Sequence, residues 1–359
     1  MAITAAMVKE LREMTGAGMM ECKKALTETD GNMDAAVDVL RKSGAAKMEK
    51  KASRIAAEGI ARVASNATEA VVAEVNSETD FVAKNEVFQE FVQTVADTAL
   101  ASGLEGGANG EDIAAVLEQN GLSDLLVEKT ATIGEKLSVR RFAKVSGECV
   151  ASYLHAGGKI GVLVAANGAS DDAAKEALTN IAMQIAAMNP EKVSRDDFSA
   201  DEMAKLRDIV IDSALNDPAS LPKPIQNELY TKVEAENLFS AEDAAVLAEK
   251  KNDKYLYNFL SKEAVAKLAE LAMANKDAYM ANKIFSGLVE GRISKQVKES
   301  TLLEQVYVKA EDGKQTVAKY LESVNKALTI TKFVRFEVGE GMEKKNEDFA
   351  AEVAAQMNA

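Results

Sequence analysis

Residues 70–95 read AVVAEVNSETDFVAKNEVFQEFVQTV. The apolar run Ala70–Val75 has the length and composition of a buried strand. A polar segment follows, and a helix is expected to begin near Lys84. The apolar face of that helix would consist of Val87, Phe88, Phe91, Val92 and Val95. A strand, a turn and a helix with one apolar face predict an α+β fold, in which helices cover one face of a sheet.

Phe81 lies beside Asp80 in the predicted turn between the strand and the helix. Connecting segments run over the protein surface, so the ring is expected to be partly exposed. Exposed aromatic side chains often anchor protein interfaces. In the alternative interpretation the ring folds back and caps the local core. From these residues alone, both interpretations remain open.

The order of hairpin and helix occurs twice along the chain, as a weak internal repeat. In the first copy, strands Gly59–Val63 and Ala70–Val75 precede the helix described above. In the second copy, strands Val150–Leu154 and Ile160–Val164 precede another helix. The inward positions of that second helix would be Leu178, Ile181, Ile185 and Met188. The repeat predicts two related subdomains, because a lone hairpin is only marginally stable without covering helices.

The first core subdomain is predicted to span 58–140, and the second to combine 141–200 with 298–341. Leu137–Val145 is expected to add a strand, although Arg140 and Arg141 interrupt its alternation. The remaining elements are a strand at Gln305–Val308, a short helix with Val317 and Leu321, a strand at Phe333–Val338 and a turn at Gly339–Gly341.

The N-terminal residues 1–45 have the pattern of a three-helix module. Thr4 can cap a first helix that ends at Gly16, and a second helix begins near Gly18. The third helix is expected to end at Gly44, since glycine is common just after a helix. Residues 46–57 then form a basic helical linker, which we interpret as a solvated connector in preference to a nucleic-acid patch.

Residues 201–297 depart from the repeat and predict a helical insertion. Ser199 and Glu202 form a capping box ahead of a helix, and a cluster of prolines then forces a non-helical connection. Two long helical stretches, 225–250 and 255–297, would form an antiparallel hairpin without a strict heptad repeat. A terminal helix module is expected over 342–359.

The composition favours helices and argues against several functions. The chain has 359 residues and a formal net charge of −14, which opposes direct nucleic-acid binding through phosphate neutralisation. Its two cysteines, Cys22 and Cys149, lie far apart and fit a reducing cytoplasm better than a disulfide framework. No apolar run is long enough to span a membrane, and no signal pattern is visible at the N-terminus.

Chemical motifs are scarce. The segment Ala156–Lys159 lacks the spacing of a phosphate-binding loop. The single histidine, His155, excludes a multi-histidine metal site, and any catalytic triad would depend on it alone. His155 also lies at a predicted hairpin turn, where a surface imidazole commonly serves as a hydrogen-bonding group. We therefore expect a binding protein, neither an enzyme nor a holder of a cofactor or metal.

Four segments together resemble the translation elongation factor Ts family, the nucleotide-exchange factors of the GTPase elongation factor Tu. They are residues 11–26 (LREMTGAGMMECKKAL), residues 79–82 (TDFV), His155 with Ile160–Leu163, and residues 333–341 (FVRFEVGEG). The resemblance covers roughly 1–200 and 285–359. The stretch near 205–285 looks longer than the protrusion usual in that family.

The resemblance implies that the N-terminal module docks on the GTPase domain of elongation factor Tu through Arg12, Met19 and Met20. Adjacent methionines offer an adaptable apolar surface. One of the two is nevertheless expected to lie in the core, because neighbouring positions on a helix point about 100° apart.

The resemblance also implies that Thr79, Asp80, Phe81 and Val82 dislodge Mg²⁺ from the partner. His155 and its hairpin would contact another domain of the partner, and the C-terminal helix would add contacts through Phe349 and Val353. The implied function is guanine-nucleotide exchange during translation elongation, in a heterodimer or higher assembly with elongation factor Tu.

Two alternatives compete with exchange. The first is an adaptor of the same fold that binds its GTPase without driving nucleotide release. The second is an enzyme that uses His155 with a nearby carboxylate. A nucleotide-release assay separates the first from an exchange factor, and an active His155→Ala protein would exclude the second.

Overall fold

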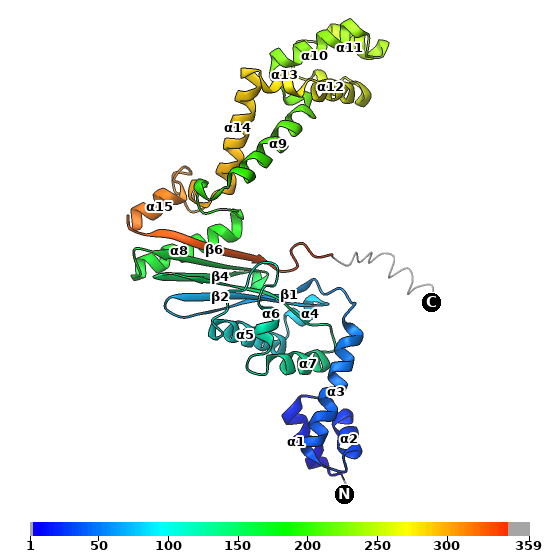
Figure 1. Cartoon of the computed structure of the whole chain (residues 1–359), viewed down its shortest axis with the longest axis vertical. Helices are drawn as coiled ribbons and strands as arrows, with labels where there is room; N and C mark the ends of the chain where they lie inside the picture. Colours follow the sequence, from blue (N-terminus) through cyan, green and yellow to red (C-terminus); the bar gives the residue numbers. More distant parts are fainter. Residues whose placement is uncertain (1–2, 344–359) are drawn as a thin grey trace. The chain divides into compact units, whose positions relative to one another are not determined.

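The computed structural model describes residues 3–343. Within them the chain forms two compact units, one from 3–189 with 306–343 and the other from 190–305 (Figure 1). The first unit combines two small sheets with helices, and the second is helical. The predicted α+β class is confirmed. Of the terminal helix expected over 342–359, residues 344–359, which include Phe349 and Val353, lie outside the described residues.

The first unit contains two antiparallel sheets of three strands each. The strand order is β1-β2-β3 in one sheet and β4-β5-β6 in the other. Their bounds are Glu58–Ser65 (β1), Glu69–Ser77 (β2), Ser138–Ser146 (β3), Cys149–His155 (β4), Ile160–Asn167 (β5) and Thr329–Glu337 (β6). The predicted strands of both hairpins, and those at Leu137–Val145 and Phe333–Val338, are present. β2 and β5, the central strands of the two sheets, are buried along most of their length, which pins their register.

The two sheets pack face to face, and each has a helix on its outer side (Figure 1). Ala61 and Val72 from the first sheet meet Leu163 and Phe336 from the second in one buried cluster. Helix α5 (Glu86–Ala101) packs on β1 and β2, and α8 (Asp172–Met188) packs on β4 and β5. This layering is the predicted pair of hairpins with covering helices.

Two of the predicted inward positions on these helices are wrong. Val87 and Met188 are 39% and 48% exposed, whereas Phe88 and Ile185 are fully buried. Val87 lies in the first turn of α5, and Met188 is the last residue of α8. At a helix end the apolar stripe extends beyond the edge of the sheet that the helix covers. An apolar residue there keeps the helical spacing but has no sheet residue to pack against.

The start of α5 depends on Asn85, whose side-chain oxygen accepts hydrogen bonds from the backbone N–H groups of Val87 (2.9 Å) and Phe88 (3.3 Å). Asn85→Ala is expected to lower the free energy of unfolding by about 1 kcal/mol, since two N–H groups lose their cap. Urea denaturation measures the loss. Glu90→Ala, at an exposed position on the same helix, is the control and should change stability by less than about 0.5 kcal/mol. Equal effects of the two substitutions would contradict the capping role.

The N-terminal module consists of α1 (Ala5–Thr15), α2 (Met19–Glu28) and α3 (Met33–Lys51) around a small core. The prediction that α3 ends at Gly44 is wrong. Gly44 lies inside the helix and faces α7 (Leu122–Ile133), where an added Cβ would lie 3.0 Å from a methyl group of Val127. Glycine here permits close helix packing, and the first residues of the expected 46–57 linker belong to α3.

The second unit contains more helices than the predicted antiparallel hairpin of two. Its helices are α9 (Ala200–Leu215), α10 (Lys223–Glu236), α11 (Ala241–Lys250), α12 (Lys262–Ala274), α13 (Lys276–Met280) and α14 (Lys283–Ser300). Asn237 adopts a left-handed conformation (φ 50°) and ends α10. Ser240, Ser261 and Asn282 cap α11, α12 and α14. These local stop and start signals divide the two long stretches.

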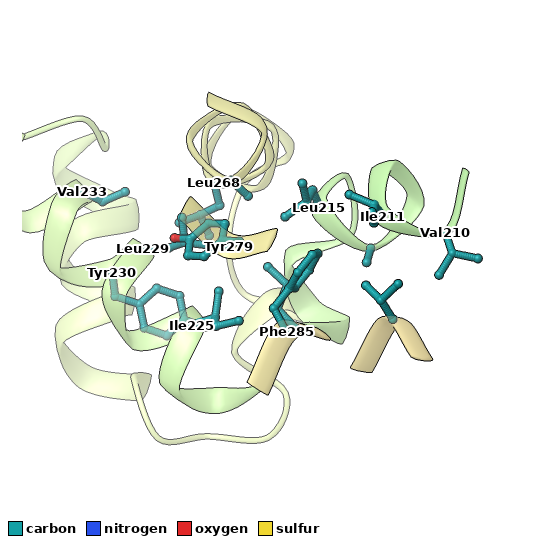
Figure 2. Close-up of a cluster of buried hydrophobic side chains, with 14 of the residues drawn as sticks. Val210, Ile211, Leu215, Ile225, Leu229, Tyr230, Val233, Leu268, Tyr279 and Phe285 are labelled. Atoms are coloured by element: carbon teal, nitrogen blue, oxygen red, sulfur yellow. The ribbon is translucent and has the colours of Figure 1, made fainter. Parts of the chain in front are cut away.

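These helices enclose a hydrophobic core of their own. Figure 2 shows Leu215 and Ile225 near Phe285, with Leu229 and Tyr279 beside Leu268. Phe285 and Tyr230 are both fully buried. Residues 190–305 therefore form a packed helical domain in place of a simple protrusion.

The strand predicted at Gln305–Val308 does not form. Val306 makes only an isolated bridge with Thr316, and the Gln184 side chain satisfies backbone groups of the segment. Its amide donates to the carbonyl of Val306 (3.1 Å) and its oxygen accepts from the N–H of Val308 (2.7 Å). A side chain thus replaces the second strand of a ladder. The short helix predicted around Val317 and Leu321 is α15 (Val317–Val324).

No helix within residues 3–343 is sufficiently long and apolar to cross a membrane.

Candidate functional site

Thr79–Val82 lies at the end of β2, where the chain enters the short helix α4 (Asp80–Ala83) before α5. Val82 and Ala83 pack into the core beneath β1 and β2. Phe81 points away from that core and is 79% exposed. Because neighbouring residues on a helix point about 100° apart, burial of Val82 and Ala83 turns Phe81 outward. The interpretation of Phe81 as a cap on the local core is wrong.

Glu135 holds the start of this segment. Its carboxylate accepts hydrogen bonds from the backbone N–H of Thr79 (3.0 Å) and from the Thr79 hydroxyl (2.7 Å). The Ser77 hydroxyl donates to the Thr79 carbonyl (3.0 Å). Thr79 is therefore tied through its amide, hydroxyl and carbonyl groups, one residue before α4 begins.

Asp80 and Lys84 form an ion pair on the surface beside the ring. The Lys84 ammonium lies 2.8 Å from a carboxylate oxygen of Asp80 and 5.8 Å from the centroid of the Phe81 ring. The hydrogen bond from Lys84 lowers the pKa of Asp80, and the positive charge of Lys159 contributes to the same shift. Asp80 therefore carries a negative charge next to an exposed aromatic ring at neutral pH.

His155 is exposed at the end of β4, immediately before the turn η1 (Ala156–Gly158). Its Nδ1 lies 3.1 Å from the Tyr153 hydroxyl. This partner is a phenol. Among the described residues, no carboxylate forms a hydrogen bond with the His155 ring. Within residues 3–343, no cluster of three His, Cys, Asp or Glu side chains could hold a metal ion.

The hairpin that carries His155 rests on the first sheet. Gly158 has a left-handed φ of 98° and approaches β1 so closely that an added Cβ would lie 2.7 Å from the carbonyl oxygen of Ala61. Lys159 forms an ion pair with Glu58, which is paired in register with Ser77 at the end of β2. The structure therefore brings the His155 turn and the Thr79–Val82 segment to the same end of the first sheet.

Arg12, Met19 and Met20 are exposed on α1 and α2, and Met19 and Met20 are 59% and 74% exposed. The prediction that one of the two methionines lies in the core is wrong. Leu11 and Cys22 are among the residues that fill the core of the module. The thioethers of Met19 and Met20 both face outward. Within residues 3–343, no hydrogen bond or ion pair joins these three residues to Thr79–Val82, and they form a separate surface.

The segment Phe333–Gly341 is tied to the first sheet through a buried carboxylate. Glu74 is fully buried and accepts from Arg141 Nε (2.6 Å), Arg140 (2.9 Å) and the backbone N–H of Gly339 (2.9 Å). The register of β2 and β3 shifts at Glu74, opposite Arg141. The two arginines that interrupt the strand pattern therefore neutralise a buried charge and hold the turn after β6.

Sequence reasoning missed Glu135, Lys84 and Lys159. Lys84 follows Asp80 by four residues, a spacing that places side chains together on a helix and could have been noticed. Glu135 is 56 residues from Thr79 and Lys159 is 101 residues from Glu58. No local pattern indicates such contacts, since only the pairing of strands brings these residues together.

Comparison with known proteins identifies the family of the chain. A family model described as "Elongation factor TS" matches residues 78–340, well over half of the chain. Elongation factor Ts of Clostridioides difficile (strain 630) is 42% identical over 367 aligned residues, which cover 99% of each protein.

These matches define the class of the protein as a translation elongation factor, which acts in protein biosynthesis. Within that class, the chain belongs to the elongation factor Ts family.

Proposed function

We propose that this protein is the guanine-nucleotide exchange factor of elongation factor Tu and promotes GDP release by displacing Mg²⁺ from that partner. The observation that carries the proposal is the exposed Phe81 ring, supported by buried neighbours on one side and by a charged Asp80 on the other. The proposed role is binding without covalent chemistry, so the protein would not be an enzyme in the usual sense.

The proposed displacement acts through geometry. Mg²⁺ requires near-ideal octahedral coordination and bridges nucleotide phosphates to protein groups. A ring inserted between two helices of the partner would shift the groups that position the waters of the ion, without touching the ion itself. Asp80 would add a negative field near the phosphates. Loss of the ion removes positive charge that holds a polyanionic nucleotide.

The energetics follow from linkage between the two ligands of the GTPase. Exchange factor and nucleotide weaken the binding of each other by the same factor. The factor therefore accelerates GDP release and leaves the final ratio of bound GDP to bound GTP unchanged. An adaptor would bind the GTPase with no such coupling.

The proposal assigns a role to each region of the chain. Residues 1–45 would dock on the GTPase domain, and 46–57 would connect this module to the core subdomains 58–140 and 141–200 with 298–341. The His155 hairpin would fix the orientation of the partner, and Phe349 and Val353 remain predicted contacts. Such a factor would work in the cytoplasm, bound to its partner as a heterodimer or a larger assembly.

Release of a fluorescent GDP analogue from elongation factor Tu, followed by stopped flow, tests the function. An exchange factor accelerates release in a manner that saturates with its concentration. An adaptor would bind in a pull-down and leave the release rate unchanged. That second result would favour the adaptor of the same fold.

The docking module makes a separate prediction. Replacement of both Met19 and Met20 by Ala is expected to weaken complex formation about tenfold, because exposed methionines supply adaptable apolar contact area. Titration calorimetry with the nucleotide-free partner measures the affinity. Met188→Ala, at a residue that is 48% exposed on α8, is the matched control and should bind normally. Unchanged affinity of the double variant would remove this surface from the interface.

A further inference from the structure

We propose that Glu135 is a positioning residue that sets the direction of the Phe81 ring through Thr79. This inference rests on the proposed function, since it concerns how the ring is presented to the partner. Glu135 lies between α7 and β3, outside the segment that the family resemblance singles out.

Thr79 occupies the N-cap position of α4, and its side chain makes no capping hydrogen bond to that helix. A threonine at this position usually accepts a hydrogen bond from a backbone N–H of the first turn. Here its hydroxyl donates to Glu135, at 2.7 Å, and its own N–H donates to the other carboxylate oxygen, at 3.0 Å. The carboxylate of Glu135 thus holds the residue from which α4 starts.

The contact is reciprocal. Glu78, the residue before Thr79, accepts a hydrogen bond from the backbone N–H of Lys136, the residue after Glu135, at 2.6 Å. Each of two neighbouring chain segments therefore gives one carboxylate to the backbone of the other. This pair of contacts fixes both the distance and the register of the two segments, whereas a single hydrogen bond would leave them free to pivot. Hydrogen bonds to charged acceptors are also stronger than neutral ones.

The chain that follows α3 also contacts Glu78 and Lys136, the junction between the two segments. Arg54 donates to Glu78 (3.2 Å), and the Lys136 ammonium donates to the carbonyl oxygens of Ala52 (2.7 Å) and Arg54 (2.9 Å). The end of the N-terminal module and the start of α4 thus share one set of hydrogen bonds.

Helix α4 needs external support. It has four residues. A helix of that length is unstable by itself, because the entropy lost in ordering the first turn exceeds the free energy gained from its hydrogen bonds. The Lys84 ammonium lies 5.8 Å from the centroid of the exposed Phe81 ring. The direction of the ring is therefore determined by the buried Val82 and Ala83 after it and by Thr79 before it. Without Glu135 the segment would have to be ordered as the ring enters the docked partner, which lowers the fraction of complexes with the ring inserted and so the maximal release rate.

A double-mutant cycle tests whether Glu135 acts through Phe81. Glu135→Ala is expected to lower the GDP-release rate at saturating factor about tenfold, and Phe81→Ala about 30-fold. The combined variant should be no slower than Phe81→Ala alone, because a ring that is absent needs no positioning. Glu135→Gln retains one acceptor oxygen and should recover part of the rate. Glu118→Ala, at an exposed position after α6 (Ile113–Leu117), is the control and should release GDP normally.

If the two losses of release rate multiply, to about 300-fold in the combined variant, Glu135 acts independently of Phe81 and the inference is overturned. A second measurement needs no partner. Glu135→Ala in the free protein should accelerate amide hydrogen exchange over 79–83 and leave α5 protected. Unchanged amide hydrogen exchange over 79–83 would also overturn the inference. Normal release by Phe81→Ala would remove the ring from the mechanism and overturn the inference with it. Failure of the unsubstituted protein to accelerate GDP release would instead contradict the proposed function.

Discussion

Phe81→Ala is expected to slow factor-promoted GDP release from elongation factor Tu about 30-fold, which corresponds to a loss of about 2 kcal/mol of coupling. The ring is 79% exposed in the free protein, so its removal leaves no cavity and costs the fold little. The substituted protein should still bind through the docking module and the His155 hairpin. The loss would therefore fall mainly on the maximal release rate, measured by stopped flow at saturating factor.

An aromatic residue with similar exposure is the control. Phe259, which is 51% exposed in the helical domain, should be replaceable by Ala without a comparable loss of release rate. Normal release by Phe81→Ala would remove the ring from the mechanism. Weaker binding with an unchanged release rate at saturating factor would indicate an anchor that contributes equally with and without nucleotide, and would also exclude the ring from the exchange step.

Phe285→Ala is expected to destabilise the helical domain 190–305 by about 3–5 kcal/mol, because a fully buried phenyl ring would leave a cavity in a close-packed core. The ring of Phe285 lies 6.2 Å from that of Tyr279, between centroids, and Figure 2 places it near Leu215 and Ile225. Since residues 190–305 form a compact unit, the loss should be confined to that unit. Hydrogen exchange resolved along the chain measures the free energy of opening of each region.

The neighbouring residue gives a matched control. Ile284 is 49% exposed, and Ile284→Ala should change the stability of the same domain by less than about 0.5 kcal/mol. The strands β1 to β3 should keep their protection in both variants. Equal weakening of both units by Phe285→Ala would contradict the division into two independently cooperative parts.

The local elements of the fold could be predicted because they depend on neighbouring residues. The apolar runs of β2 and β5 and the alternation of the other strands mark the two sheets before any contact is known. The helix caps at Thr4 and Ser199 are equally local, since each side chain bonds a backbone group three residues away. The exposure of Phe81 was open from the sequence, because both an anchor and a core cap are compatible with the same turn.

The errors share a cause, which is that packing partners distant in sequence override local signals. Gly44 resembles a helix stop, yet α3 continues through it because Val127 on α7 requires close approach. The segment at Val306 has the composition of a strand, yet the Gln184 side chain takes the place of a pairing strand. The long stretch 255–297 predicts one helix, and the caps at Ser261 and Asn282 divide it around a core that needs several short helices.

By itself the amino-acid sequence determined the α+β class, the paired hairpins and the four motifs of the elongation factor Ts family, since each is carried by residues close together along the chain. Only the tertiary structure decided that Phe81 faces outward, that both Met19 and Met20 are exposed, and that Glu135 holds Thr79. These properties depend on which distant segments meet, and pairing of β2 with β3 brings 79 and 135 together across 56 residues. Local propensity has no information on such contacts, whereas burial and hydrogen bonding in the folded chain specify them.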